Sequence, residues 1–240
     1  MSFNVGNCKT MHIGHNNPRN DYHLQGNTLD KSDLEKDLGV FVSSDLKPSA
    51  HIAKIAAKAN ARVGLIKRTF TYMDKDIFLS LYTTLVRPIL DYGVQCWSPY
   101  LVKDINKLEQ VQRRATLMVP ECSALHYEDR CKTLGLQTLQ ARRERGDMIE
   151  VYRLLTGMEG VHHSKFFRLS ESHARGEGYT RGHSKKIVKP DHWRTSIKGN
   201  WFAIRCIDPW NSLPEEVVSA PSIATFKKRY DLYVSQRSNP

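Results

Sequence analysis

Lys54, Lys58 and Arg62 follow one another at intervals of four within HIAKIAAKANARVGLIKRTF, which spans residues 51–70. Side chains at this spacing are neighbours on one face of a helix, and like charges there are mildly unfavourable unless an anion lies over them. At about 100° per residue the apolar side chains fall in a separate sector, which predicts an amphipathic helix. Its charged face is either a solvated outer face or a surface that binds phosphates, and the stripe alone does not decide between them.

Two further predicted helices carry basic residues beside an apolar stripe. If the three helices turn these stripes inward, their cations could line one groove that binds phosphates without reading base sequence. The candidate nucleic-acid-binding residues on the three helices are Lys54, Lys58, Arg62, Lys67, Arg68, Arg113, Arg114, Arg142, Arg143 and Arg145.

Carboxylates in a cluster are what a metal-dependent polymerase or nuclease needs, because two divalent cations must be held about 4 Å apart. The sequence contains no Asp-Asp pair. Asp74 and Asp76 stand at a predicted helix start, where capping explains them, and Glu128-Asp129 is followed directly by Arg130. We therefore predict no catalytic residue in this chain.

Metal and phosphate-loop motifs are also missing from the sequence. Cys122 and Cys131 are nine positions apart with His126 between them, which is outside the usual spacings of zinc ligands. Neither familiar Gly-rich phosphate loop occurs. We predict no metal site and no cofactor. The five cysteines are odd in number and widely spread, which favours reduced thiols over a disulfide framework.

The composition favours a polyanionic partner. The 240 residues carry a formal net charge of +11, with 40% hydrophobic and 25% charged residues, so the chain has the apolar content of a globular protein and an unusual basic excess. No apolar run approaches the roughly 18 residues of a membrane span, and the first residues do not resemble a secretion signal. We expect an intracellular protein, in the nucleus or cytoplasm, that binds nucleic acid and not a membrane.

The pattern of elements predicts a mainly α fold that begins with a small antiparallel β hairpin or sheet. Residues 1–48 look β-rich, with a hairpin turn at Gly26-Asn27 and a buried strand at 38–42 (LGVFV). Ser49, directly after Pro48, is the expected N-cap of the first helix.

The helices that follow are predicted at 74–97, 102–119, 126–133 and 136–157. Asp74 is a candidate cap, and Pro88 should kink or divide its helix because the ring clashes with the preceding turn. Thr138 is a candidate cap, and Gly157 a candidate terminator.

The last third of the chain changes character. Gly, His, Ser and basic residues dominate the stretch before residue 197 and suggest a flexible connector. WNSLP (210–214) is expected to be a packing corner, and a final helix is expected near 222–236. The predicted parts are a β-rich segment (1–48), a helical bundle (49–120), a helical extension (121–160), a basic flexible connector (161–196) and a loop-rich C-terminal segment ending in a helix (197–240).

Four segments of the sequence resemble one known family, in the same order as in that family: KDLGVFVSSDLKPSAHI, LYTTLVRPILDYGVQCWSP, DINKLEQVQRRAT and LHYEDRCKTLGLQTLQARRERGDMIEVYRLL. Together they resemble the segment downstream of the reverse transcriptase core in non-LTR, jockey-like retrotransposon proteins. WNSLPEEVVSAPSIATFKKRYDLY resembles the extreme C-terminus of the same proteins. The similarity covers nearly the whole chain.

The resemblance implies a role for each part. CKTMHIG (8–14) resembles the end of the palm, the hairpin that grips the primer terminus. Lys9 and Met11 would lie in this hairpin, and Lys9 joins the candidate nucleic-acid-binding residues. The helices from 49 to about 119 resemble the thumb, which holds the template–primer duplex. The expected partner is therefore RNA, DNA or a hybrid duplex.

The resemblance also implies that catalysis lies elsewhere. In these enzymes polymerisation depends on an aromatic-x-Asp-Asp turn and an earlier aspartate, both upstream of the segment that this chain resembles. We therefore expect a non-catalytic fragment of an RNA-directed DNA polymerase that binds template–primer. The alternatives are a polymerase part that needs its catalytic palm in trans, or an inactive, interaction-only remnant that self-associates through unpaired strand edges.

Overall fold

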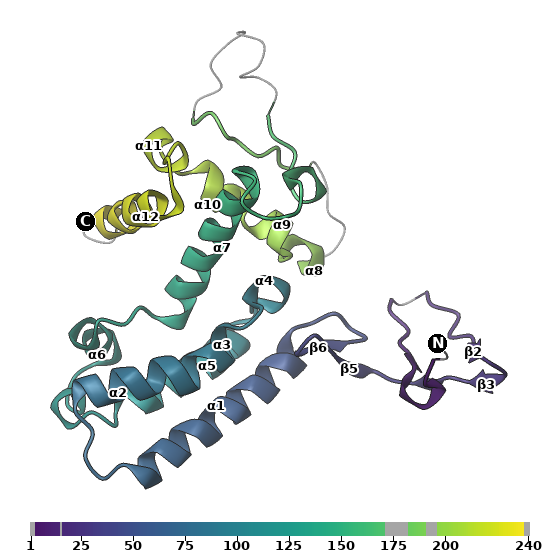
Figure 1. Ribbon diagram of the computed structural model, residues 1–240, viewed down its shortest axis with the longest axis horizontal. Helices are drawn as coiled ribbons and strands as arrows, with labels where there is room; N and C mark the ends of the chain where they lie inside the picture. The colour runs from purple at the N-terminus through teal and green to yellow at the C-terminus, as the bar shows by residue number, and fades with distance from the viewer. Residues whose placement is uncertain (1–2, 15, 171–181, 191–195, 238–240) are drawn as a thin grey trace. The chain divides into compact units, whose positions relative to one another are not determined.

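The computed structural model describes residues 3–14, 16–170, 182–190 and 196–237 (Figure 1). The chain divides into two compact units, Met1–Leu139 and Gln140–Pro240, where the sequence suggests five segments. Each unit has its own hydrophobic core. The fold is mainly helical with a small β-rich start, as predicted.

The β-rich start contains three pairs of short strands. Two pairs are antiparallel, as expected. The third pair is parallel, which was not predicted from the sequence. The antiparallel pairs are β2 (His23–Leu24) with β3 (Asn27–Thr28) and β5 (Leu34–Asp37) with β6 (Val40–Ser43); the parallel pair is β1 (Lys9–Thr10) with β4 (Asp30–Lys31). A short 3-10 turn, η1 (Val5–Asn7), precedes them.

The two hairpin turns differ in position from the turn and the strand that the sequence predicts there. The β2–β3 turn is Gln25-Gly26, one position earlier than predicted, with φ of 51° and 78°. The β5–β6 turn is Leu38-Gly39, with φ of 44° and 90°. Two-residue hairpin turns with positive φ at both positions match the right-handed twist of the strands. The predicted strand at 38–42 is therefore partly turn, and it is not fully buried.

Helix α1 (Ser49–Thr69) buries the predicted apolar stripe but begins differently from the prediction. Pro48 occupies the N-cap position, and Ser49 makes no capping bond. The Ser49 hydroxyl instead donates to Asp104 Oδ2 at 2.5 Å. This bond joins the first turns of α1 and α5 (Val102–Thr116).

The predicted helix over 74–97 is divided, as Pro88 suggests. It consists of α2 (Lys75–Leu81), the π-helical η2 (Tyr82–Val86), α3 (Arg87–Asp91) and α4 (Val94–Trp97). Asp74 caps α2 by accepting from the Ile77 N–H at 2.8 Å, as expected. Proline cannot donate a backbone bond, and the widened π turn lies just before it. The break before α4 is at Gly93, whose φ of 63° suits glycine.

The next helices match their predicted positions closely. Of these, α5 and α6 belong to the first unit, and α7 lies in the second unit from Gln140 onward. Helix α5 ends at Thr116, before the predicted 119, and η3 (Pro120–Cys122) follows. Helix α6 (Tyr127–Leu134) ends at Gly135, and α7 (Leu139–Leu155) is followed by Gly157 at φ 72°. Met158 N–H donates to Arg153 C=O and Gly157 N–H to Leu154 C=O, the Schellman pattern expected of a glycine terminator.

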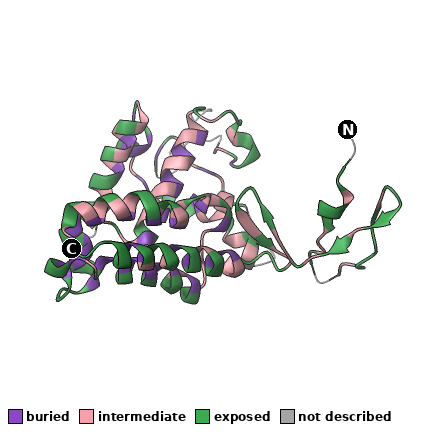
Figure 2. Ribbon diagram, turned by 60° about the horizontal axis from the view of Figure 1, so that its bottom comes forward, coloured by how far each residue is buried: buried purple, intermediate pink, exposed green. Residues whose placement is uncertain are grey.

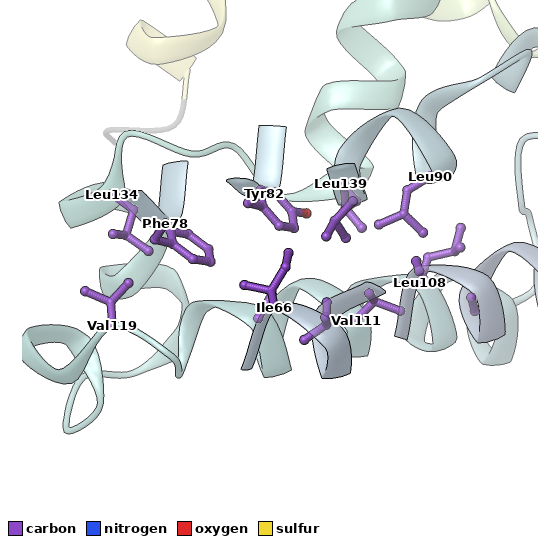
Figure 3. Packing of buried hydrophobic residues seen from close by; sticks show 14 of the residues in the cluster. Ile66, Phe78, Tyr82, Leu90, Leu108, Val111, Val119, Leu134 and Leu139 are labelled. Atoms are coloured by element: carbon purple, nitrogen blue, oxygen red, sulfur yellow. The ribbon is translucent and has the colours of Figure 1, made fainter. Parts of the chain in front are cut away.

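The core of the first unit lies between α1, α5 and the divided helix (Figure 3). Its labelled side chains are Ile66, Phe78, Tyr82, Leu90, Leu108, Val111, Val119, Leu134 and Leu139. The long helices show buried stripes inward and exposed residues outward (Figure 2). This arrangement leaves the polar sides of α1 and α5 on the surface.

The second unit is built around Trp210, at the predicted packing corner. Trp210, Phe226 and Tyr152 form stacked ring contacts in its centre. Its other helices are η4 (His163–Lys165), α8 (Ser196–Gly199), α9 (Phe202–Arg205), α10 (Ile207–Asn211), α11 (Glu215–Val218) and α12 (Ile223–Arg237). The predicted final helix is thereby confirmed.

The described parts of the predicted connector belong to this second core. Phe167 and Ile187 are buried in it, and Leu169 pairs with Ile187 in an antiparallel bridge. His183 is buried against Trp210, with Nε2 3.0 Å from the Trp210 carbonyl oxygen. These residues are packed and do not form a loose link. Residues 171–181 and 191–195 lie outside the described residues.

Candidate nucleic-acid interface

Helices α1 and α5 pack side by side and form the candidate interface. On α1 the side chains of Lys54, Lys58 and Arg62 are exposed, as the helical spacing predicts. The helix contains no aspartate or glutamate. Its solvent side therefore carries positive charge without local compensation.

Helix α5 does contain two carboxylates, but both are directed inward. Asp104 is 2% exposed and accepts from Ser49, while Glu109 is 8% exposed. Glu109 Oε1 accepts from the Tyr127 hydroxyl and from the Leu139 N–H, the latter at 3.1 Å. The exposed charges of both helices are consequently all cationic.

Two lysines that the sequence reasoning missed complete the α5 part of this surface. Lys103 and Lys107 are exposed and each falls within about 20° of Arg114 at 100° per residue. The signal was present as an i, i+4, i+11 spacing, but the adjacent Arg113-Arg114 pair was more conspicuous. We name Lys54, Lys58, Arg62, Lys103, Lys107 and Arg114 the α1–α5 cationic surface.

Arg113 has a different role from Arg114, because it contacts a neighbouring helix. Its guanidinium carbon lies 4.6 Å from the centroid of the Tyr127 ring, a cation–π contact that joins α5 to α6. Burial and the hydrogen bond to Glu109 raise the pKa of the Tyr127 hydroxyl, so the ring stays neutral. Arg113 is exposed, but part of its guanidinium is used to hold α6.

The hairpin β5–β6 covers the start of α1 and supports Lys54. Phe41 N–H donates to His51 Nδ1 at 3.1 Å, and the His51 ring lies 4.9 Å from the Trp97 ring. Lys54 Nζ is 5.6 Å from the centroid of the Phe41 ring. The Lys54 side chain is thus oriented by an aromatic neighbour and remains exposed.

Lys67, Arg68 and Lys9 are exposed as well, although each has another explanation. Lys67 and Arg68 lie in the last turn of α1, where cations stabilise the negative end of the helix dipole. Lys9 lies in β1, and Met11 follows it outside any strand. These three residues are therefore not part of the α1–α5 cationic surface.

The third predicted contributor, α7, departs from the expectation. Arg143 is only 5% exposed, so it is not on a binding surface, and Arg142 is half-buried. Arg145 donates to both carboxylate oxygens of Asp231, at 2.6 and 2.8 Å. The hydrogen bonds to Asp231 raise the pKa of Arg145, so the guanidinium stays protonated. Its positive charge is balanced by the Asp231 carboxylate. The surface therefore comes from two helices of the first unit.

Comparisons with known proteins provide one weak relative. An uncharacterized protein of Caenorhabditis elegans, B0403.1, is 24% identical over 124 residues, which cover 50% of this chain. The match covers 63% of the length of that relative. No protein-family model matches the chain, and no solved structure matches it.

Within the described ranges, no group of three or more His, Cys, Asp or Glu side chains is placed to hold a metal ion. All five cysteines are free thiols. No helix in the part of the chain that the structure describes is long and apolar enough to cross a membrane.

Proposed function

We propose that this protein binds nucleic acid through the α1–α5 cationic surface, as the thumb-like part of a non-LTR retrotransposon reverse transcriptase, and does not polymerise by itself. The observation that carries the proposal is the inward direction of both α5 carboxylates, which leaves only cations on the outer sides of α1 and α5. The resemblance of the quoted strings to that family supports the same assignment.

Such a surface recognises phosphates and not bases. Lysine and arginine side chains that neutralise phosphates release condensed counterions, which gives sequence-independent, salt-dependent binding. Each phosphate contact on a duplex contributes about −0.9 to the slope of log affinity against log salt concentration. The resemblance of residues 49–119 to a thumb makes a duplex, such as an RNA–DNA hybrid, the expected ligand.

The direct test is the affinity for a labelled RNA–DNA hybrid, measured by fluorescence anisotropy from about 50 to 200 mM salt. We expect tight binding at low salt that weakens steeply as salt is added. A primer-extension assay with magnesium or manganese on the same sample should give no incorporation. Absent binding at low salt, or binding indifferent to salt, would rule out the proposal.

Charge reversal locates the surface. Lys54→Glu combined with Lys58→Glu should weaken hybrid binding and reduce the salt slope by roughly 2. The matched control is Lys75→Glu with Lys132→Glu, because both lysines are exposed in the first unit but lie on α2 and α6. Equal losses in the two double variants would show a net-charge effect without a defined surface.

An interaction-only role is the second candidate, and the strand pairs favour it. Each pair has two strands and therefore open edges, and Leu38 at the β5–β6 turn is a strongly exposed apolar side chain. Concentration-dependent self-association in sedimentation velocity, together with an absence of nucleic-acid binding, would favour this role over the first.

A further inference from the structure

The second unit contains an open cavity of about 420 Å³ that the α1–α5 surface does not explain. Its apolar floor includes Phe167, Ile187 and Ile207, all buried in the second core. The volume falls in the range of small-molecule sites. Because the floor is part of a packed core, the cavity is a fixed feature of this unit.

The rim of the cavity has an aromatic ring and a cation. Phe166 lines the cavity and remains 44% exposed. Its ring centroid is 6.4 Å from that of Phe202 in an edge-to-face contact, which restricts its orientation. Arg168 also lines the cavity and is exposed.

The charge of the cavity favours an anionic ligand. None of the described residues that line it is an aspartate or glutamate. Two of these described residues are cations. Lys189 is bonded to Asp208 at 2.6 Å, whereas the Arg168 side chain makes no hydrogen bond or ion pair with another described residue. Arg168 thus supplies the free positive charge at the rim.

We propose that this cavity binds one nucleotide unit, with the base stacked on Phe166 and the phosphate held by Arg168. Every base has a π face, so stacking on an aromatic ring tolerates different bases, and a nearby arginine adds the phosphate contact. The source of the nucleotide is either a free mononucleotide or a single-stranded nucleic acid. This site lies in the second unit and does not depend on duplex binding by the first.

The experiment uses the full chain carrying Lys54→Glu and Lys58→Glu, so that binding by the α1–α5 surface is reduced. One arm titrates AMP by calorimetry, and the other titrates a labelled six-nucleotide oligo(A) RNA by anisotropy. Phe166→Leu keeps an apolar side chain but removes the π face, Phe166→Tyr restores it, and Arg168→Gln removes the charge. Lys228→Gln is the matched control, because Lys228 is exposed on α12 and does not line the cavity.

We expect Phe166→Leu to weaken oligo(A) binding by at least about fivefold, the lower end of a stacked base, while Phe166→Tyr retains it. Arg168→Gln should lower the salt slope by about 0.7, the value for one single-strand phosphate. AMP binding with the same sensitivities would identify a free nucleotide as a sufficient ligand, and its absence would identify the single strand.

The proposal is overturned if the wild-type cavity binds neither ligand. It is also overturned if Phe166→Leu and Arg168→Gln bind like Lys228→Gln. Circular dichroism of each variant verifies that the second unit is folded, and the conservative Phe166→Tyr change separates loss of stacking from loss of packing.

Discussion

At the scale of single residues, burial and partners decide which cations reach solvent. Lys58 and Arg62 are exposed as predicted, because helical periodicity is a local property of the sequence. Arg145 was assigned to the same function, but its partner Asp231 lies 86 positions away in the chain. A pairing at that separation leaves no signal in local spacing.

His51 provides a prediction at this scale. The residue is 1% exposed, with its ring between Phe41 and Trp97. Nδ1 accepts the Phe41 N–H, and the buried Nε2 has no hydrogen-bond partner among the described residues. Burial lowers the pKa of His51. The cations Lys36 and Lys54 lie near the Phe41 ring and do not favour a protonated imidazole. The folded protein therefore prefers the neutral imidazole.

A lowered folded pKa means that the unfolded chain binds a proton more readily. The stabilisation by neutral His51 is complete above the unfolded pKa of about 6.5 and is lost as pH falls below it, by at most about 1.4 kcal/mol per pH unit. Urea unfolding between pH 7.5 and 5 should show this loss, and His51→Gln should show less of it. Identical pH dependence in the two proteins would contradict the assignment to His51.

At the scale of elements, the helices were easier to predict than the strands. The apolar period of α1 and α5 repeats over several turns, so position and inward face follow directly. The strands are two to four residues long, and their partners are set by pairing that no single strand encodes. Turns with positive φ at Gln25 and Leu38, neither of them glycine, shifted the predicted positions.

A buried amide, the side chain of Gln112 on α5, joins α5 to neighbouring elements of the first unit. Its Oε1 accepts from the Tyr82 hydroxyl at 2.6 Å, and its Nε2 donates to the Tyr127 hydroxyl and the Gln137 carbonyl, both at 2.9 Å. Gln112→Ala removes these hydrogen bonds and the contact of Nε2 with Cys131 Sγ at 3.7 Å. It leaves the buried Tyr82 hydroxyl without its partner, and an unpaired buried polar group costs about 1–3 kcal/mol, in addition to the packing lost with the side chain. We expect a loss of roughly 3 kcal/mol or more in the free energy of unfolding.

The comparison for this prediction is Gln110→Ala, on the exposed side of the same helix. An exposed substitution of this kind should change stability by no more than about 0.5 kcal/mol. Urea unfolding of both variants measures the difference. If Gln112→Ala is no less stable than Gln110→Ala, the buried amide does not hold these elements together.

At the scale of the whole molecule, the sequence predicted the helical class but not the division into two cores. The stretch around 161–196 has the composition of a connector, yet Phe167 and Ile187 are core residues of the second unit. Their burial depends on contacts with residues such as Trp210, which are distant in the chain. Local composition therefore suggested a loose segment, whereas long-range packing buries Phe167 and Ile187 within its described part.

Two separate cores predict two separate responses to destabilisation. In the second unit Arg205 donates to both oxygens of Asp147, at 2.8 and 3.0 Å, and Asp147 is buried. Asp147→Ala leaves the half-buried guanidinium without its carboxylate, which should cost on the order of 3 kcal/mol. Hydrogen exchange should then accelerate in peptides of the second core, such as those from α7 and α10, while α1 and α5 exchange as before.

Gln112→Ala should give the reciprocal result, with faster exchange in α1 and α5 and little change around Trp210. Hydrogen exchange resolves such responses because each cooperative unit opens with its own free energy. If either variant accelerates exchange equally in both cores, the chain unfolds as one cooperative unit despite its two hydrophobic centres. Agreement with the two-unit pattern would mean that the α1–α5 cationic surface and the cavity beside Phe166 belong to units that unfold independently. Each unit could then be destabilised while the proposed binding site on the other is retained.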